Sequence, residues 1–388
     1  MRQHAKRLGA LGLLVAAVLA GCSSTSQNQQ PNQGSTPFVF QALNLRQQDA
    51  QGQLLWRVNS PEARYDLNRR LALARNLSGE IHAKGQVLYR LQASHGTVIN
   101  DGAVIQLEGV VRIERLGQDP VTITASRMRW YPPQQRIELD RGASAQDQDL
   151  RLTAAKATLL FDRDLLQLRG QPTLMARRAV AGAGLDQLKL QQLDWSPGSG
   201  RLMAPGPVQA SSTASGQIRR ELKASGLEGN TLSRTLTLKE PVRVSVPAQN
   251  AWLEARSSTI DLVSGQVRSG APFTAAVGPL QIAGEALQLD LRASVAQIVA
   301  GCRLRQPDLS LSARRCSWNW QNEAIAATGS VVLRRQANQQ TTRAAQLRGR
   351  IGPRGLLVFS APGSRVQSTL VLPPAQPRRQ QSPSAIRL

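Results

Sequence analysis

The chain has few of the residues that build compact cores. Its 388 residues include five Phe, three Tyr and six Trp, together with three His and three Cys. Because aromatic side chains supply much of the buried area in compact β-sandwiches, their scarcity argues against an ordinary closed core. Leu, Val and Ala are plentiful instead, which favours a long, narrow interior lined by aliphatic side chains.

The sequence also lacks the motifs of common catalytic and metal sites. His4 lies in the N-terminal leader, and His82 and His95 are isolated on expected strands. There is no His-x-x-x-His pair, Gly-x-Ser-x-Gly turn, Cys-x-x-Cys pair or phosphate-binding Gly-x-x-x-x-Gly-Lys loop. Asp162 and Asp164 fall at an expected turn, where Asp is favoured for backbone reasons. We therefore expect no enzyme, no metal site and no cofactor.

Acidic residues are scarce as well. The formal net charge is +23, of which Arg2, Lys6 and Arg7 in the leader account for three, so the remaining chain carries 23 − 3 = +20. Arg binds phosphates and carboxylates through a planar fork, and it greatly outnumbers Lys here. Nucleic acid, an anionic membrane face or a phosphorylated lipid would each suit such a chain. Solubility alone is the alternative explanation.

What the chain does contain is a repeated hairpin. Residues 93–113 read as a small residue, a strand, an Asn-Asp-Gly turn and a second strand with alternating apolar positions, which is a strong hairpin signal. Units of this kind recur at gaps of 30, 32, 30, 69, 31, 28, 30 and 31 residues, and the long gap holds a further unit near residues 189–203. The small residues that open the units are Ala63, Ala93, Ala125, Ala155, Ala224, Ala255, Ala283, Ala313 and Ala344.

These repeats predict an all-β fold. Beyond the first twenty residues no window shows a sustained helical period, and strands with turns every 8–12 residues dominate. An apolar-x-apolar pair followed by Gly or Pro also recurs, as in IQLEG, LLQLRG and LTLKEP. We predict about ten hairpin units of roughly 30 residues, each touching its neighbours in a stack.

The N-terminus resembles that of a bacterial lipoprotein. A basic stretch is followed by an apolar run from Leu8 to Ala20, too short to span a membrane, and then by Leu19-Ala20-Gly21-Cys22. We expect cleavage before Cys22 and lipidation of its thiol, with acyl chains that hold the protein on a membrane. The polar residues 23–37 then form a flexible tether.

The order of signals from residue 38 onward resembles the LptC family, the periplasmic C component of the lipopolysaccharide export system. These signals are a strand, Asp-x-x-Gly, a strand with Trp, Ala-x-Tyr, Leu-x-Leu, Ala-x-x-Gly and Leu-x-Gly-x-Val. The matching residues are Asp49, Gly52, Trp56, Ala63, Tyr65, Leu71, Leu73, Ala93, Gly96, Leu107, Gly109 and Val111. Units from Ala125 onward look like the related OstA repeat of LptA. Typical LptC proteins keep an uncleaved membrane helix and have about half this length, so the lipobox and the extra repeats depart from the family pattern.

The resemblance implies an elongated, open, twisted β-jellyroll that holds acyl chains between its two sheets. It divides the chain into a signal peptide (1–21), a flexible tether (22–37), an LptC-like jellyroll (38–175), OstA/LptA-like repeats (176–372) and a disordered tail (373–388). Strand parity then selects the groove residues expected to contact acyl chains: Leu54, Trp56, Val87, Tyr89, Leu91, Ile105, Leu107, Val111, Ile113, Ile123, Leu166 and Leu168.

Two features of the second half complete the expectations. Residues 171–183 lose clear alternation, which fits either a kink between two stacks or a longer loop inside one stack. Cys302 and Cys316 form an even pair in an exported chain, which favours a disulfide over free thiols. Fourteen residues apart, they are expected to face each other on neighbouring strands.

The leading functional hypothesis is a non-catalytic component of lipopolysaccharide transport. It would be lipid-anchored at the periplasmic face of the inner membrane, take lipopolysaccharide from an ABC transporter and pass it to an LptA-like bridge protein or an outer-membrane assembly. Nucleic acid is not an expected partner. The alternative is a structural envelope lipoprotein, a closed β scaffold with a dry interior. A secreted glycan-active enzyme is the third hypothesis, and it would need paired carboxylates at a cleft, which the sequence does not offer.

Overall fold

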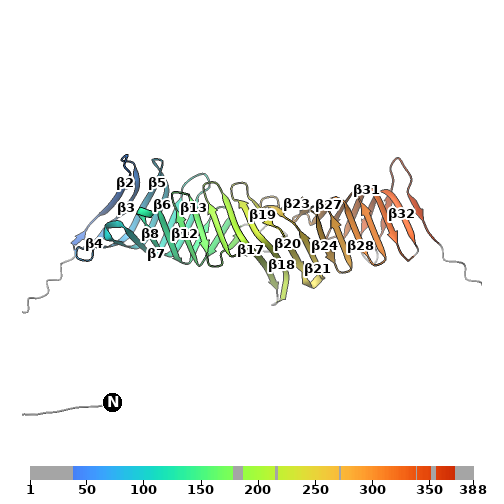
Figure 1. Cartoon of the computed structure of the whole chain (residues 1–388), viewed down its shortest axis with the longest axis horizontal. Helices are drawn as coiled ribbons and strands as arrows, with labels where there is room; N and C mark the ends of the chain where they lie inside the picture. The colour runs from blue at the N-terminus through green and yellow to red at the C-terminus, as the bar shows by residue number, and fades with distance from the viewer. Residues whose placement is uncertain are drawn as a thin grey trace, which may run out of the picture. The chain divides into compact units, whose positions relative to one another are not determined.

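Antiparallel strands make up nearly all of the protein. The computed structural model describes residues 38–177, 187–214, 217–270, 272–337, 339–350 and 355–371. These residues form 34 strands and three short 3-10 turns, Asn100–Gly102, Pro132–Gln134 and Pro247–Gln249 (Figure 1). The predicted all-β jellyroll of repeated hairpins is confirmed.

The strands form two layers that are joined by long, bent strands. Layer I continues from β1 at one edge to β33 at the other, and each member pairs with the next in antiparallel register. Its short strands are β1 (Phe38–Phe40), β4 (Glu62–Asp66), β9 (Arg136–Arg141), β12 (Lys156–Leu160), β13 (Leu165–Arg169), β16 (Gln192–Ser196), β19 (Thr235–Lys239), β22 (Ser258–Asp261), β23 (Gln266–Ser269), β26 (Ala286–Asp290), β27 (Val295–Ala300), β30 (Arg315–Asn319) and β33 (Leu357–Ser360).

Layer II runs alongside in the same chain order, from β2 to β34. Its short strands are β2 (Leu43–Gln48), β3 (Leu54–Ser60), β10 (Ala143–Gln146), β11 (Leu150–Ala154), β14 (Thr173–Ala176), β15 (Gln187–Leu190), β20 (Val242–Val246), β21 (Ala251–Ala255), β24 (Phe273–Val277), β25 (Leu280–Gly284), β28 (Cys302–Gln306), β29 (Leu309–Ala313) and β34 (Gln367–Thr369).

Eight long strands belong to both layers. One half of each pairs in layer I and the other half in layer II, and most of their pairings shift register where the strand bends. Such bulges let a strand turn a corner without losing its partners on either side. The long strands are β5 (Leu71–Ala83), β6 (Gln86–Ile99), β7 (Val104–Arg115), β8 (Val121–Tyr131), β17 (Arg201–Ala214), β18 (Gln217–Asn230), β31 (Ala324–Arg335) and β32 (Gln340–Arg350).

The two corners of each repeat explain the sequence pattern. The chain passes from layer I to layer II at a glycine in most repeats, with a left-handed backbone conformation (φ +64° to +96°) at Gly109, Gly142, Gly170, Gly206, Gly301 and Gly329. Only glycine adopts this conformation without strain. The glycine that ends each of the motifs IQLEG and LLQLRG is therefore a corner residue.

The recurring alanine marks the opposite passage, from layer II to layer I. Ala125 lies in β8 between the residues that pair with β10 and those that pair with β9. Ala255 and Ala313 end the layer II strands β21 and β29 immediately before the chain enters layer I. A small side chain suits this position because the two layers converge at the corner. At one repeat the two corner residues touch, since a Cβ added to Gly170 would lie 2.8 Å from the Cβ of Ala155.

The buried faces of the two layers face each other. Trp56 of layer II contacts Trp130 of layer I, with ring centroids 5.2 Å apart. The buried residues form two clusters along the chain, one from Trp56 to Val242 and one from Ala255 to Leu347. We call these parts the closed segment (residues 56–242) and the open segment (residues 253–359), for reasons given below.

The strand ladder is continuous across residue 175. Strand β13 pairs with β16 in layer I, and β14 pairs with β15 in layer II. The stretch 171–183, expected to be either a kink or a loop, contains β14, and its residues 178–183 lie outside the described residues. The division at residues 175–176 stays a prediction, as do the leader, tether and tail, which lie largely or wholly outside the described residues.

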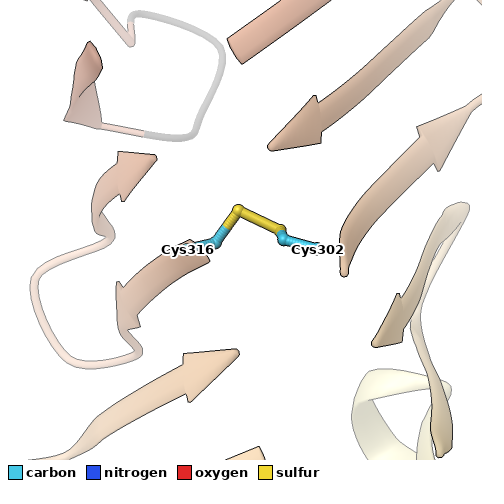
Figure 2. Close-up of a disulfide and its surroundings, with 2 residues drawn as sticks. All are labelled: Cys302 and Cys316. Atoms are coloured by element: carbon cyan, nitrogen blue, oxygen red, sulfur yellow. A yellow bond between two sulfur atoms is a disulfide. The ribbon is translucent and has the colours of Figure 1, made fainter. Parts of the chain in front are cut away.

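Cys302 and Cys316 form a disulfide in the structure, with Cα atoms 5.9 Å apart (Figure 2). The expectation that they lie on neighbouring strands was wrong. Cys302 begins β28 of layer II, whereas Cys316 lies on β30 of layer I, and these strands do not pair with each other. The disulfide therefore joins the two layers, close to the corner where β29 leads into β30.

We predict that Gly170→Ala destabilises the fold by about 2–3 kcal/mol in urea unfolding. About 1 kcal/mol arises from the left-handed backbone, and the remainder from the clash with Ala155. Gly85→Ala is the matched control, because Gly85 has the same φ of +76° but open space around its Cβ. Equal losses for both variants would show that the corner contact contributes nothing.

Replacing both cysteines, in the variant Cys302→Ser/Cys316→Ser, is expected to lower the free energy of unfolding by about 3 kcal/mol, because a 14-residue loop is released in the unfolded chain. Urea unfolding of the oxidised protein measures this loss. The reduced wild type serves as a second measurement and should lose a similar amount; an unchanged midpoint for both proteins would contradict the prediction.

Candidate functional site

The apolar interior between the two layers is the candidate site. Ten of the twelve residues predicted to line a groove are buried there, and Leu54 and Val87 are half-buried near hairpin turns. They belong to rows of directly opposite neighbours, such as Leu91, Ile113 and Ile123 in layer II. The structure thus brings the predicted set together in the interior. Their contact with acyl chains stays a prediction.

An aromatic cluster fills the interior at the start of the closed segment. Trp130 lies 5.2 Å from Trp56 and 6.5 Å from Phe161, and Phe161 lies 5.4 Å from Tyr89, measured between ring centroids. All three contacts are edge-to-face, the geometry that aromatic pairs prefer. Trp130 and Phe161 were not among the residues predicted to line the groove.

Each strand of a layer runs from a corner to a hairpin turn, so the turns of the two layers form two rims. We call the space between these rims the mouth. In the closed segment a polar cluster crosses it: Arg115, at the end of β7 in layer II, binds Asp164 in the β12–β13 turn of layer I. The Arg115 Nε lies 3.0 Å from both carboxylate oxygens of Asp164, and its Nη2 lies 2.9 Å from Oδ2.

Two further groups complete this latch. The Tyr89 hydroxyl donates a hydrogen bond to Asp164 Oδ1, and the backbone N–H of Gly198 donates one to Oδ2 at 2.9 Å. A Cβ at position 198 would overlap Asp164 Oδ2 and Arg115 Nη2, so a larger residue in the Ser196-Pro197-Gly198 turn would displace these side chains. Asp164 was expected to serve only its own turn. Its partners lie 34 to 75 residues away in the chain, and local sequence carries no signal of them.

Burial sets the electrostatics of the latch. Desolvation raises the pKa of Tyr89 far above its ordinary value, and the charge of Asp164 adds to this effect, so the hydroxyl remains a donor. Burial works to lower the pKa of Arg115, but the hydrogen bond and charge of Asp164 outweigh it and the pKa is raised. With side chains only 14% and 23% exposed, Arg115 and Asp164 are largely shielded from solvent.

A second ion pair crosses the mouth further along the closed segment. Arg234, in the β18–β19 turn of layer I, binds Asp149 in the β10–β11 turn of layer II, with Nε 2.7 Å from Oδ2. Its Nη2 also donates to the side-chain carbonyl of Gln148. Together with the Arg115 latch, this pair holds the rims of the closed segment together.

The open segment differs from the closed segment in the contacts across its mouth and in the burial of its interior. Among the described residues from 253 to 371, no ion pair or side-chain hydrogen bond crosses the mouth. Its interior residues near the corners are buried, whereas those nearer the turns are only half-buried. The half-buried set, which the sequence-based selection missed because it stopped at Leu168, is Leu253, Ile282, Leu289, Leu304, Leu309, Leu357 and Phe359.

No group of three or more His, Cys, Asp or Glu side chains in the described part of the chain is arranged to hold a metal ion. No helix among these residues is long and apolar enough to cross a membrane. Cys22, the predicted lipidation site, lies outside the described residues.

The fold and the interior define a class of protein: an all-β jellyroll of repeated hairpins that encloses a continuous apolar interior between two layers. Residues 9–173 match the family model described as LptC, lipopolysaccharide-assembly, LptC-related. The resemblance read from the sequence is confirmed over this segment, which is less than half of the chain. The match to OstA-type repeats in residues 176–372 is a finer assignment and stays a prediction.

Among solved structures, the chain is similar to LptH, the LptA homologous periplasmic component of the conserved lipopolysaccharide transport device from Pseudomonas aeruginosa. It is 16% identical to this chain and the match covers 30% of this chain and 82% of LptH, with a TM-score of 0.26. No curated protein matches the chain.

Asp164→Asn is expected to destabilise the protein by about 2 kcal/mol, because Arg115 would keep its buried charge without a full counter-charge. Urea unfolding measures the loss, and hydrogen exchange should become faster in β12 and β13. Glu114→Gln is the control, since the Arg112–Glu114 pair is 46% and 41% exposed, and its loss should cost under about 0.5 kcal/mol. Similar effects of both substitutions would exclude the latch.

Proposed function

We propose that this protein is a non-catalytic component of lipopolysaccharide transport and that its interior holds the acyl chains. One observation carries the proposal beyond the family match. In layer I a single row of directly opposite inward residues passes through every strand from Phe38 of β1 to Leu357 of β33, and nearly all of its members are apolar. A continuous apolar track suits a molecule that moves along the protein.

The energetics favour acyl chains as the occupant. Each buried methylene contributes about 0.8 kcal/mol, so several chains in the interior would be held firmly without any directional contact. The half-buried interior of the open segment offers such chains a place to bind without rearrangement. In the closed segment they would enter only when the Arg115 and Arg234 pairs separate, because the interior residues there are packed against each other.

The ends of the stack suit partner proteins of the same architecture. Among the described strands, β1 and β2 pair on one side only, as do β33 and β34. Exposed apolar side chains accompany these edges, including Phe38 and Val39 at one end and Val358 at the other. An unpaired edge of this kind binds another sheet by strand addition. We infer that one end meets an inner-membrane ABC transporter and the other an LptA-like bridge protein or an outer-membrane assembly.

The location follows from the same proposal. Lipidation of Cys22 would anchor the chain to the inner membrane, with the folded part in the periplasm and the polar residues 23–37 as its tether. The direction of transport and the transporter contact belong to the proposal as well.

A structural envelope lipoprotein is the second candidate function. The observation that favours it is the closed segment, most of whose interior residues are buried and packed against each other. A scaffold of this kind would bind no lipid at any interior position.

Photo-crosslinking distinguishes the two candidates. We expect a crosslinking residue at Leu289, which faces the half-buried interior, to form adducts with lipopolysaccharide in cells, whereas one at the neighbouring Gln288 should form none because it faces outward. In the closed segment Val111 and Arg112 form the corresponding pair, with Val111 fully buried. Adducts at the inward positions alone support transport through the interior. The absence of adducts at both Leu289 and Val111 favours the scaffold.

A further inference from the structure

The outer face of layer II carries a groove that faces away from the apolar interior. It has a volume of about 790 Å³ and lies over β21, β24, β25, β28, β29 and β31 in the open segment. The residues that face it alternate along each strand with the interior residues: Arg303 and Arg305 are exposed, whereas Leu304 between them packs into the interior cluster. The outward lining residues are Ala276, Ala283 and Val332 together with Trp252, Thr274, Gln281, Arg303, Arg305, Ser310, Ser312 and Arg334.

Strand register brings three of the arginines together. Arg305 of β28 lies opposite Ser310 of β29, and Ser310 lies between β28 and the strand that carries Arg334. Neighbouring strands are about 4.8 Å apart, so the two arginine-bearing strands are separated by about 10 Å with a small serine between them. Arg303 is opposite Ser312 on the same face. Arg305 and Arg334 therefore lie on either side of Ser310, whereas Arg303 has Ser312 and then Val332 beside it.

These arginines have no acidic partner among the described residues. Some arginines elsewhere on the outer faces are paired with carboxylates on the adjacent strand, as in Arg57–Glu80, Arg127–Asp140 and Arg169–Asp194. No such ion pair involves Arg303, Arg305 or Arg334, and residues 324–388 contain ten Arg and no Asp or Glu. Like charges on nearby strands repel each other, so the arrangement weakens the fold unless an anion neutralises it.

The rest of the groove indicates what kind of anion would fit. Thr274, Gln281, Ser310 and Ser312 offer hydrogen-bonding groups at several points along it, and the Trp252 ring lies at its far side. Arg forks bind phosphate through two parallel hydrogen bonds, whereas hydroxyl and amide groups beside an aromatic ring suit sugar rings. From β21 to β31 the groove crosses five strand spacings, about 24 Å, which exceeds a single phosphate.

We propose that this groove binds a phosphate-bearing oligosaccharide. Arg303, Arg305 and Arg334 bind its phosphates, the serines and Thr274 bind its hydroxyl groups, and a sugar ring packs against Trp252. The proposal rests on the proposed function for the source of this saccharide, which is the glycan of the transported lipid. The lipid would then contact both faces of layer II, with acyl chains inside and charged sugars outside.

The test uses the full chain and a probe without acyl chains: the phosphorylated oligosaccharide released by complete deacylation of lipopolysaccharide. Isothermal titration calorimetry should show binding by the wild type and at least tenfold weaker binding by Arg303→Gln/Arg305→Gln/Arg334→Gln. The control is Arg268→Gln/Arg315→Gln/Arg348→Gln, which removes the same charge from outward positions of layer I. The control should change affinity less than twofold, and the dephosphorylated probe should not bind.

Several outcomes would overturn the proposal. These are no binding of the probe by the wild type, an equal loss for both triple variants, or equal binding of the dephosphorylated probe. Tighter binding of polyglutamate than of the saccharide would identify the groove as a contact for an acidic protein instead. Arg305→Gln alone replaces the triple variant if thermal unfolding shows that the latter does not fold. Because the probe has no acyl chains, its failure leaves the crosslinking result at Leu289 unaffected, and the two proposals fail separately.

Discussion

The strand register is the constraint on which the rest of the structure depends. Side chains alternate between the two faces of a strand, so a slip of one residue would exchange every interior residue with an outward one. The register is kept from β1 to β33 in layer I, through three sets of long strands that bend from one layer into the other. Glycine and alanine at the corners let the chain change layers without interrupting these rows. The apolar interior and the basic outer groove are two faces of the same alternation.

The two segments solve the problem of an apolar interior in different ways. In the closed segment, interior packing buries most of the apolar residues, two ion pairs cross the mouth, and the aromatic cluster fills the interior near its start. In the open segment the rims are not joined among the described residues, and leucines near the turns remain half-buried. Apolar surface that stays accessible in a folded protein usually has a ligand or partner. The open segment is therefore where an apolar molecule can bind at least cost to the fold.

The sequence predicted the local elements well because they depend on local signals. Alternation gave twelve inward residues, all before residue 169, of which ten are buried, and the small residues and glycines recur because each repeat has two corners. The latch could not be predicted, since Asp164 meets Tyr89 and Arg115 through the pairing of strands distant in the chain. The disulfide between Cys302 and Cys316 was predicted from the sequence. The cysteines lie in different layers and not on neighbouring strands, because spacing alone does not say that a corner separates them. The half-buried leucines after residue 250 were not in the predicted set, because the residues that carry the resemblance lie in the first half of the chain.

The position of the disulfide has a mechanical consequence. Cys302 and Cys316 join layer II to layer I near a corner of the open segment, where no charged pair holds the rims. A covalent bond at this place fixes the distance between the layers on the corner side and leaves the opposite side free. Widening in this segment is then restricted to rotation about a fixed axis, and the layers cannot separate as a whole. Such rotation would change the width of the mouth while the strand ladders stay in register.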